Sequence, residues 1–527
     1  MGKTARSRLV ATLVAGALAA TACSGGGGTE GAGAGCAARA GERAAKAVLR
    51  CTEGSIGFVE TEVSSGTGVV VEVEGKRYVL TNEHVVDPFD AADVTVGAAT
   101  FEDLPVVGVD ISADVALLGP LTGRDLPAPL ALADGTGLER GDDVFLVGFP
   151  GEANTDDLEV TIASGIVSRL RDVKEFAQTY IQTDATIAGG QSGGPLFDGD
   201  ANLVGISGLA FAEGEFALAL AGRDTAEAVE RILAGDGDEY LSLPGGAHTG
   251  GRAGAAGATS GTLSIFDGSD GQVLFLPAAG GDRTWNLTVD MSARPVVTVG
   301  TMAGDEPLAV SSNAEAVQGE ISRRLAKARG GRPDALPDPE AAGHDPKIAA
   351  RETRPGTFAI PVKADESALV FVAVPLTDRP VTVGWTSDLP LVAASRPVTE
   401  KRLDVGGTLD GIVGGLDTSI DVMVDLAAGQ RVQLHARSPQ GDPGFAVYTP
   451  GTRLDHLTAA DPEGAGVEVF DDTDDGLLGL DAKTTFEAEK SGTYRFRLYN
   501  NEYTSIHVRF SVVDCAGRDC DATKPTT

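Results

Sequence analysis

The sequence predicts an all-β protein built from several consecutive domains. Short apolar runs recur from residue 55 to residue 235 between Gly, Asp and Pro turns, which is the pattern of a barrel or sandwich. Similar runs recur at 262–385 and 402–513. A chain of 527 residues has room for about three to four domains. Aromatic residues make up only 5%, so we expect cores of Val, Leu, Ala and Ile.

Residues 1–23 are predicted to be a lipoprotein signal peptide. A basic region is followed by an apolar run, Leu9–Ala20, which is too short to span a bilayer comfortably. Small residues then precede Cys23, and a tether of Gly, Ala and Ser follows at 24–35. This arrangement resembles a bacterial lipoprotein box, so we expect Cys23 to carry lipid on the outer face of the cell membrane. An ordinary secretory signal is the alternative, because leucine is usual where Ala20 stands.

The cysteine count agrees with lipidation, because five cysteines in an exported protein leave one unpaired. If Cys23 carries lipid, the other four cysteines are expected to form two disulfide bonds, Cys36–Cys51 and Cys515–Cys520. Each would close a short loop in an oxidising compartment. The chain has no CxxC motif, so no metal site is predicted.

The tether leads into an Ala-rich segment, Ala37–Arg50, with helical character, so residues 24–50 are predicted to be a tether and N-terminal helix. The first all-β domain is predicted at 51–240. Within it, apolar runs at 69–73 and 78–80 indicate two strands around a turn at Glu74-Gly75.

The stretch Gly189–Leu196, GGQSGGPL, contains a candidate nucleophile. A serine hydroxyl needs a base to take its proton and backbone N–H groups aimed at the oxyanion that forms. Glycine on both sides of Ser192 allows a sharp turn and close approach of a substrate carbonyl. In this arrangement the N–H groups of Gly190 and Ser192 would form the oxyanion hole. The alternative is a plain glycine-rich turn, since the chain holds 70 glycines.

Two further residues favour catalysis. His84 follows a predicted strand and can serve as a general base; the other five histidines lie beyond residue 240. Asp114 immediately precedes an apolar run, so it is expected at the mouth of a buried strand, where it would orient His84. Asp110 is the better candidate for a turn aspartate.

The order His, Asp, Ser is that of chymotrypsin-like double barrels, and residues 55–235 resemble a trypsin-like serine protease of the HtrA (Deg) type. The resemblance implies two six-stranded antiparallel barrels with the active site between them. It implies His84 as base, Asp114 as orienting group, Ser192 as nucleophile, and protein or peptide substrates. The matching segments are 65–70 (SGTGVV), 81–86 (TNEHVV), 113–118 (ADVALL), 147–151 (VGFPG), 164–168 (SGIVS), 182–185 (QTDA), 189–196 and 203–206 (LVGI).

The chain departs from the resembled proteins in three places. Digestive trypsins carry aspartate before the serine, where this chain has Gln191, so activation by N-terminal trimming is not expected. Nothing after residue 240 resembles a PDZ domain. The position that holds the pocket carboxylate of trypsin is Thr186, which carries no charge.

The primary specificity pocket is therefore expected to favour small aliphatic side chains. Its wall would come from the residues before the nucleophile and from the strand after it, whose backbone would pair with the substrate. These pocket residues are Thr186, Ile187, Ala188, Ser207, Gly208 and Leu209.

A helix is predicted to begin at Asp224, with Glu227 completing a capping box and Val229, Ile232 and Leu233 packing onto the second barrel. A Gly/Ala linker follows at 241–261. Residues 262–400 are predicted to form a β-sandwich interrupted by a helical insertion at 313–329 and a Pro-rich, mobile segment at 332–343.

The last domain, 401–527, is expected to be a second β-sandwich. It resembles the bacterial pre-peptidase C-terminal domain, a small jelly-roll-like sandwich, at 427–432 (AAGQRV), 445–451 (FAVYTPG) and 491–498 (SGTYRFRL). The acidic run 471–476 could ligate calcium, but it lacks the EF-hand spacing and a solvated turn is favoured.

A formal net charge of −34 argues against nucleic-acid binding, which needs a basic surface. The expected function is a membrane-anchored, extracytoplasmic serine endopeptidase that needs no cofactor. Oligomers are common in the resembled family, so an oligomer is possible here. The alternative is a non-catalytic surface protein with a protease-like binding domain; an esterase is disfavoured, because no strand–GxSxG–helix elbow is present.

Overall fold

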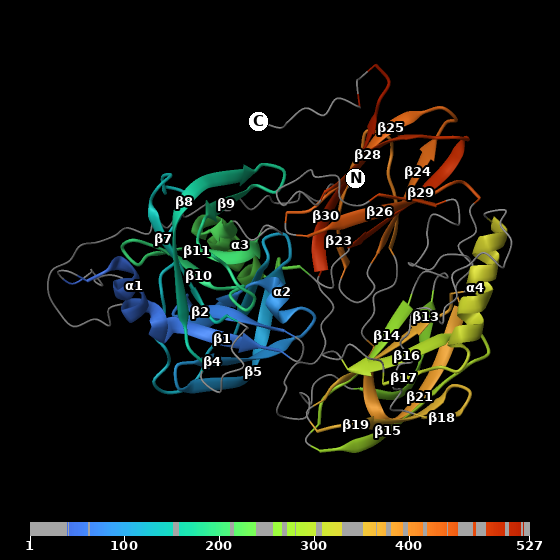
Figure 1. Cartoon of the computed structure of the whole chain (residues 1–527), viewed down its shortest axis with the longest axis horizontal. Coiled ribbons are helices and arrows are strands. Elements are labelled where there is room, and N and C mark those ends of the chain that lie inside the picture. Colours follow the sequence, from blue (N-terminus) through green and yellow to red (C-terminus); the bar gives the residue numbers. More distant parts are fainter. Residues whose placement is uncertain are drawn as a thin grey trace, which may run out of the picture.

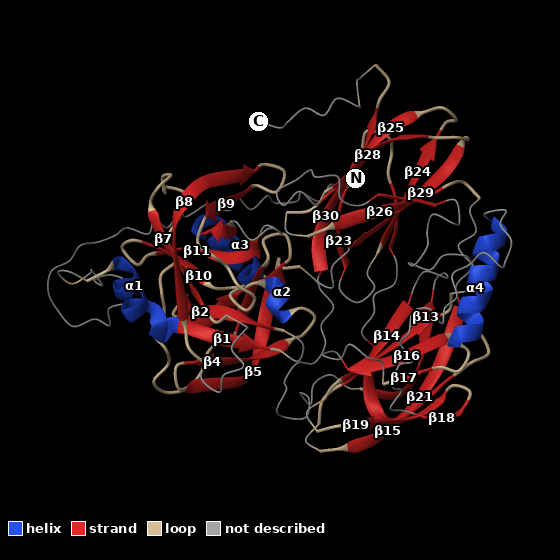
Figure 2. Cartoon of the chain, in the orientation of Figure 1, coloured by secondary structure: helices blue, strands red, loops and turns tan. Residues whose placement is uncertain are grey.

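The structure is a computed structural model in which the described part of the chain consists mostly of strands, arranged in three bodies (Figure 1, Figure 2). It describes residues 39, 42–61, 64–150, 158–210, 216–238, 257–265, 271–279, 281–301, 308–328, 351–364, 366–375, 381–393, 399–414, 419–439, 441–451, 467–470, 481–500, 505–517 and 520. Two closed six-stranded barrels fit the chymotrypsin-like double barrel, and further sheets follow.

The first barrel closes in the order β1-β2-β3-β6-β5-β4. The predicted hairpin is confirmed: Glu74 and Gly75 both have positive φ, and Val73 pairs with Lys76 around them. Its strands are β1 (Ile56–Glu60), β2 (Ser65–Val73), β3 (Lys76–Thr81), β4 (Ala91–Val96), β5 (Ala99–Asp110) and β6 (Val115–Leu118).

The second barrel closes in the order β10-β11-β12-β9-β8-β7. Its strands are β7 (Asp143–Gly148), β8 (Thr161–Val173), β9 (Gln178–Thr183), β10 (Pro195–Asp198), β11 (Leu203–Ala210) and β12 (Ala217–Ala221). A hydrophobic core with members such as Val69 and Phe197 extends through both barrels, so the two barrels are packed as one unit.

Two helices border the barrels. Helix α1 (Ala44–Thr52) overlaps the predicted N-terminal helix, ends two residues beyond Arg50, and packs its Val48 into the shared core. Helix α3 (Gly222–Ala234) begins two residues before the predicted start, and its N-cap Ala221 has no side-chain cap. The predicted capping box is therefore wrong, because the Asp224 carboxylate instead accepts a hydrogen bond from the backbone N–H of Thr179 at 2.5 Å.

Helix α3 contacts both barrels rather than the second alone. Val229, Ile232 and Leu233 pack into the shared core as predicted, but the helix lies against β5 and β6 as well as β11 and β12. It ends at Ala234, and the positive φ of the following Gly235 closes the last turn.

The first sandwich is a nine-stranded arrangement in which the long strand β21 pairs with β13 along most of its length, with β15 near its middle and with β14 through its last residues. The helical insertion is present as α4 (Ala314–Ala328). The strands are β13 (Ala258–Ile265), β14 (Gly271–Leu276), β15 (Arg283–Val289), β16 (Val296–Thr301), β17 (Ala309–Val310), β18 (Arg351–Arg354), β19 (Thr357–Val362), β20 (Ala368–Ala373) and β21 (Val381–Ala393).

The second sandwich consists of a five-stranded and a four-stranded sheet over one common core, which contains Phe445 from one sheet and Phe510 from the other. The first sheet holds β22 (Thr399–Arg402), β24 (Ile420–Leu426), β26 (Pro443–Tyr448), β27 (Val467–Phe470) and β29 (Gly492–Asn500). The second holds β23 (Thr408–Gly414), β25 (Arg431–Arg437), β28 (Ala482–Glu487) and β30 (Ser505–Asp514).

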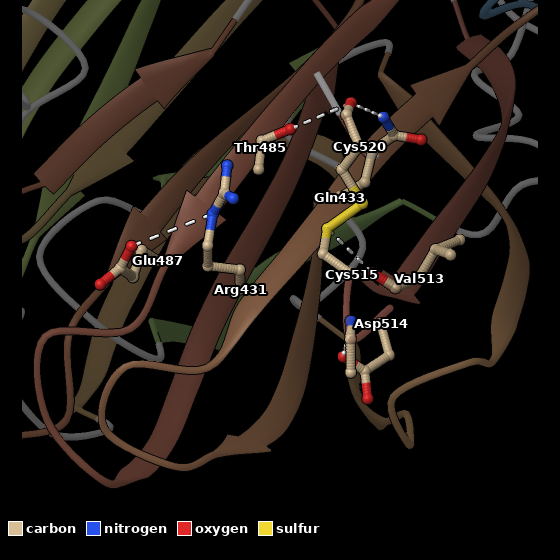
Figure 3. The surroundings of a disulfide bond; sticks show 9 residues. Arg431, Gln433, Thr485, Glu487, Val513, Asp514, Cys515 and Cys520 are labelled. Atoms are coloured by element: carbon tan, nitrogen blue, oxygen red, sulfur yellow. Dashed lines mark hydrogen bonds and ion pairs between the residues drawn. A yellow bond between two sulfur atoms is a disulfide. The ribbon is translucent and has the colours of Figure 1, made fainter. Parts of the chain in front are cut away.

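The predicted disulfide Cys515–Cys520 is present, directly after β30 (Figure 3). The Cys520 carbonyl accepts a hydrogen bond from Gln433 Nε2 at 2.8 Å, so this short loop is fixed to β25. Cys23, Cys36, the Pro-rich segment 332–343 and the acidic run 471–476 lie outside the described residues, so the predictions made for them stay predictions. Within the described part, no helix has the length and apolarity needed to cross a membrane.

Candidate active site

His84 lies on α2 (Glu83–Val86), a one-turn helix that directly follows β3. The sequence placed it at a strand end, so the helical turn is a correction. Its Nδ1 lies 2.8 Å from Oδ2 and 3.0 Å from Oδ1 of Asp114, and its backbone N–H donates to Oδ1 at 3.1 Å. The His84 side chain is 28% exposed and that of Asp114 is 6% exposed. A buried carboxylate therefore holds an imidazole that is still open to solvent.

Asp114 is placed by the turn between β5 and β6. It has φ +52°, a left-handed conformation that Asp tolerates better than most residues. Asp110 stabilises this turn as expected: its Oδ1 accepts hydrogen bonds from the Ser112 hydroxyl and the Ala113 N–H, and Arg231 Nε donates to its Oδ2 at 2.7 Å. The turn therefore fixes the carboxylate of Asp114 before substrate arrives.

Ser192 lies in the loop that precedes β10 of the second barrel, and this loop is bonded to the first barrel. The Thr67 N–H donates to the Ser192 carbonyl at 2.7 Å, and the Thr67 hydroxyl donates to the Gly190 carbonyl at 2.9 Å. A Cβ on Gly66 would lie 2.7 Å from the Val85 methyl groups and 3.0 Å from the Ser192 carbonyl oxygen. Gly66 thus lies between helix α2 and the serine loop. Because it has no side chain, the helix that carries His84 and the loop that carries Ser192 lie close to each other.

Asn82 connects Asp114 to Gly193, the residue directly after Ser192. Its Nδ2 donates to the Asp114 carbonyl at 2.7 Å, and its Oδ1 accepts the Gly193 N–H at 2.5 Å. A Cβ on Gly208 would lie 2.7 Å from this amide and 2.8 Å from Asp114 Oδ2, so the absence of a side chain at Gly208 leaves room for Asn82. Thr67 and Asn82 were not among the predicted site residues, although they stand in the segments 65–70 (SGTGVV) and 81–86 (TNEHVV).

The serine loop is stabilised internally by Gln191, which is 3% exposed. Its Oε1 accepts the Ala188 N–H at 2.8 Å, and its Nε2 donates to the Thr161 hydroxyl at 3.1 Å. An uncharged side chain thus stabilises the loop at the position where digestive trypsins carry an aspartate. Gly190, one of the two proposed oxyanion donors, has φ +87°, which favours glycine at this position.

The predicted pocket residues lie on both sides of the serine loop. Thr186 is exposed, while Ile187 and Ala188 are half-buried, with Ile187 packed on the core of the second barrel. The Ser207 N–H donates to the Gly194 carbonyl and the Ser207 carbonyl accepts the Gly193 N–H. Both backbone groups of Ser207 are therefore occupied, and pairing with a substrate strand is left to the backbone from Gly208 onward.

Glu83, the neighbour of His84, is an unexpected buried acid. It is 1% exposed, and its Oε1 has no hydrogen-bond partner among the described residues. Burial, together with the negative charges of Asp87, Asp114 and Asp238, raises the pKa of Glu83 well above its usual value. Burial at this position therefore favours the protonated, uncharged form of the Glu83 carboxyl in the folded protein.

We expect Glu83→Gln to make stability less dependent on pH. Above the usual pKa of 4.5 the unfolded chain releases the Glu83 proton while the folded chain keeps it, so stability falls as pH rises. Removing this group should remove a slope of up to about 1.4 kcal/mol per pH unit. The measurement is calorimetric unfolding at pH 5 and pH 8; an equal loss in wild type and variant would contradict the assignment.

In the described part of the chain, no group of three or more His, Cys, Asp or Glu side chains is arranged to hold a metal ion.

Comparison with known proteins agrees with this geometry. Residues 66–206 match the family described as the trypsin-like peptidase domain. The Serine protease Do-like HtrA of Bacillus subtilis is 33% identical over 185 residues, which cover 33% of this chain and 40% of the relative. The periplasmic serine endoprotease DegP of Escherichia coli is 37% identical over 145 residues, covering 27% of this chain and 29% of the relative.

Among solved structures, the HtrA-type protease AlgW with tripeptide is 28% identical, with a TM-score of 0.32, and covers 35% of this chain and 62% of that chain. The chain spans less than half the length of the curated relatives named above. The matched range falls within the two barrels, so the pre-peptidase resemblance of the last domain stays a prediction.

Proposed function

Since residues 66–206 form a trypsin-like peptidase domain of the HtrA type, we propose that the chain is a serine endopeptidase that hydrolyses peptide bonds through an acyl-enzyme on Ser192. The observation that supports this most strongly is the His84–Asp114 pair, in which Nδ1 lies 2.8 Å from a buried carboxylate. The loop that carries Ser192 is hydrogen-bonded to the same barrel through Thr67. A domain that only binds peptides would not need this pair.

Each residue has a chemical role in this mechanism. Asp114 accepts the Nδ1–H of His84, so Nε2 is the nitrogen that takes the Ser192 proton as Oγ attacks the substrate carbonyl. The N–H groups of Gly190 and Ser192 stabilise the oxyanion. His84 then returns the proton to the leaving amine, and water hydrolyses the acyl-enzyme by the same route. All the groups that this mechanism needs come from the chain itself.

The substrate is proposed to be a protein or peptide in an extended conformation, paired with the backbone of Gly208 and Leu209 and cleaved after Val, Ala or Leu. Thr186 carries no charge, and Ile187 offers apolar surface, so a cationic side chain in the pocket would lack a partner. A peptide-library profile of wild type beside Ser192→Ala tests this. We expect small aliphatic residues at the cleaved position; dominance of Arg or Lys there would overturn the pocket assignment.

We further propose that the protein works outside the cytoplasm, attached to the membrane through lipid on Cys23. The proposal is supported by the short apolar run before Cys23, the small residues beside it and the odd cysteine count. Cys23→Ser should move the mature protein from the membrane fraction to the soluble fraction. A mature N-terminus that begins elsewhere, found by mass spectrometry, would refute lipidation and favour an ordinary secretory signal.

A further inference from the structure

The segment directly after helix α2 is held by both C-terminal sandwiches. Asp87 and Phe89 follow His84 by three and five residues, and their N–H groups donate to the carbonyls of Glu83 and Val86, at 2.9 Å and 2.7 Å. Displacement of this segment would therefore displace the helix that carries His84.

Phe89 packs into the first sandwich. Its ring is fully buried and meets the edge of Phe275, with the ring centroids 6.1 Å apart. Phe275, also fully buried, and Val273 belong to β14, whose other residues Leu274 and Leu276 point into the sandwich core. A strand that is apolar on both faces needs a cover on its outer face, and Phe89 of the barrel provides it here.

The second sandwich contacts the same segment from another side. The Ser505 N–H, at the start of β30, donates to Asp87 Oδ2 at 2.7 Å, and both residues are buried. Ile412 of β23 packs against the cluster that contains Val85 and Val86 of helix α2. The segment from Val85 to Phe89 is therefore in contact with both domains outside the double barrel.

The second sandwich also contacts the barrel that carries Ser192. Arg509 lies over the Phe176 ring at 5.3 Å and donates to the Glu175 carbonyl, and His507 meets the edge of the same ring at 5.7 Å. Arg437 pairs with the Glu175 carboxylate at 3.3 Å. One sandwich thus contacts both barrels, and so links the barrel of the base to the barrel of the nucleophile.

We propose that the two C-terminal sandwiches position His84, and that Phe89, Phe275, Asp87 and Ser505 are positioning residues for catalysis. The inference rests on the proposed peptidase function. Because proton transfer from Ser192 requires His84 within hydrogen-bond reach, a small displacement of α2 costs rate without removing any reacting group.

The test uses Phe275→Ala in the full chain. Phe275 lies on the outer face of its sandwich, so the sandwich core stays intact. We expect faster hydrogen exchange at the amides of residues 83–89 and a fall in kcat of about 10- to 100-fold, with KM nearly unchanged. Phe275→Leu, which keeps an apolar cover, should restore most of the rate.

The matched control is Phe371→Ala. Phe371 lies on the same face of the same sheet, opposite Val273, but it is 37% exposed and stands outside the Phe89 cluster. We expect Phe371→Ala to keep the wild-type rate of hydrogen exchange at residues 83–89 and the wild-type kcat. The double variant of Phe89→Ala and Phe275→Ala should lose no more activity than the worse single variant, because both remove one contact.

The outcomes separate the two proposals. Unchanged hydrogen exchange at residues 83–89 in Phe275→Ala would show that the first sandwich does not hold this segment. Faster exchange with a wild-type kcat would overturn the positioning role. An equal effect of Phe371→Ala would show that the Phe89 contact is not the cause. A wild-type protein that cleaves no peptide would refute the peptidase proposal and the positioning role with it, while exchange would still decide whether the sandwiches hold the segment.

Discussion

Replacing Ser192 by alanine is expected to lower kcat by about 10⁴- to 10⁶-fold, the range seen when a serine nucleophile is removed. The protein should stay folded, because the contacts that hold the loop use backbone atoms: the Ser192 carbonyl accepts from the Thr67 N–H and the Gly190 carbonyl from the Thr67 hydroxyl. The residual rate would come from substrate binding and the oxyanion donors.

Steady-state cleavage of a peptide identified by library profiling measures this loss, and unfolding curves control for stability. His84→Ala should lose a similar factor, and the double variant should be no worse than either single variant, because the two residues act as a unit. Near-normal turnover by either single variant would contradict the assigned roles.

Asp114→Asn should lower kcat by about 10⁴-fold. Both carboxylate oxygens of Asp114 lie within 3.0 Å of His84 Nδ1, and Oδ1 also accepts the His84 N–H. An asparagine that keeps the backbone contact through its oxygen directs its NH₂ group at Nδ1. That nitrogen must then accept instead of donate, so the proton moves to Nε2 and His84 cannot take the Ser192 proton.

The fold should survive this substitution, because Asn82 bonds to the backbone carbonyl of Asp114 and not to its side chain. The measurement is kcat of the variant and of the wild type as a function of pH. A variant that keeps kcat within a few-fold of wild type would show that the carboxylate does not orient the base.

Local sequence signals predicted the elements that local interactions determine. The alternation of β2 and β3 around Glu74-Gly75 is a short-range hairpin signal, and the structure has it. Helix α2 was missed because Glu83–Val86 is too short to show helical periodicity. The start of α3 was misplaced because Asp224 accepts a hydrogen bond from Thr179, which is 45 residues away, instead of capping its own helix.

The supporting residues of the site were beyond sequence reasoning for the same reason. Thr67 bonds to a carbonyl 123 residues away, and Asn82 to an N–H 111 residues away. Neither leaves a local pattern, since only the docking of the two barrels brings the partners together. The run Val273–Leu276 is different, because it is apolar at every position and lacks the alternation of a half-exposed strand. Such a run is typical of a strand that is buried on both faces.

The central claim, that Ser192 is an activated nucleophile, is tested most directly by labelling the folded full-length protein with a fluorophosphonate and locating the adduct by mass spectrometry. The claim predicts a single adduct on Ser192, which is lost in Ser192→Ala and greatly slowed in His84→Ala. Well-folded wild-type protein that takes up no label, or that is labelled at another residue, would contradict it and would favour a barrel pair that only binds its partners.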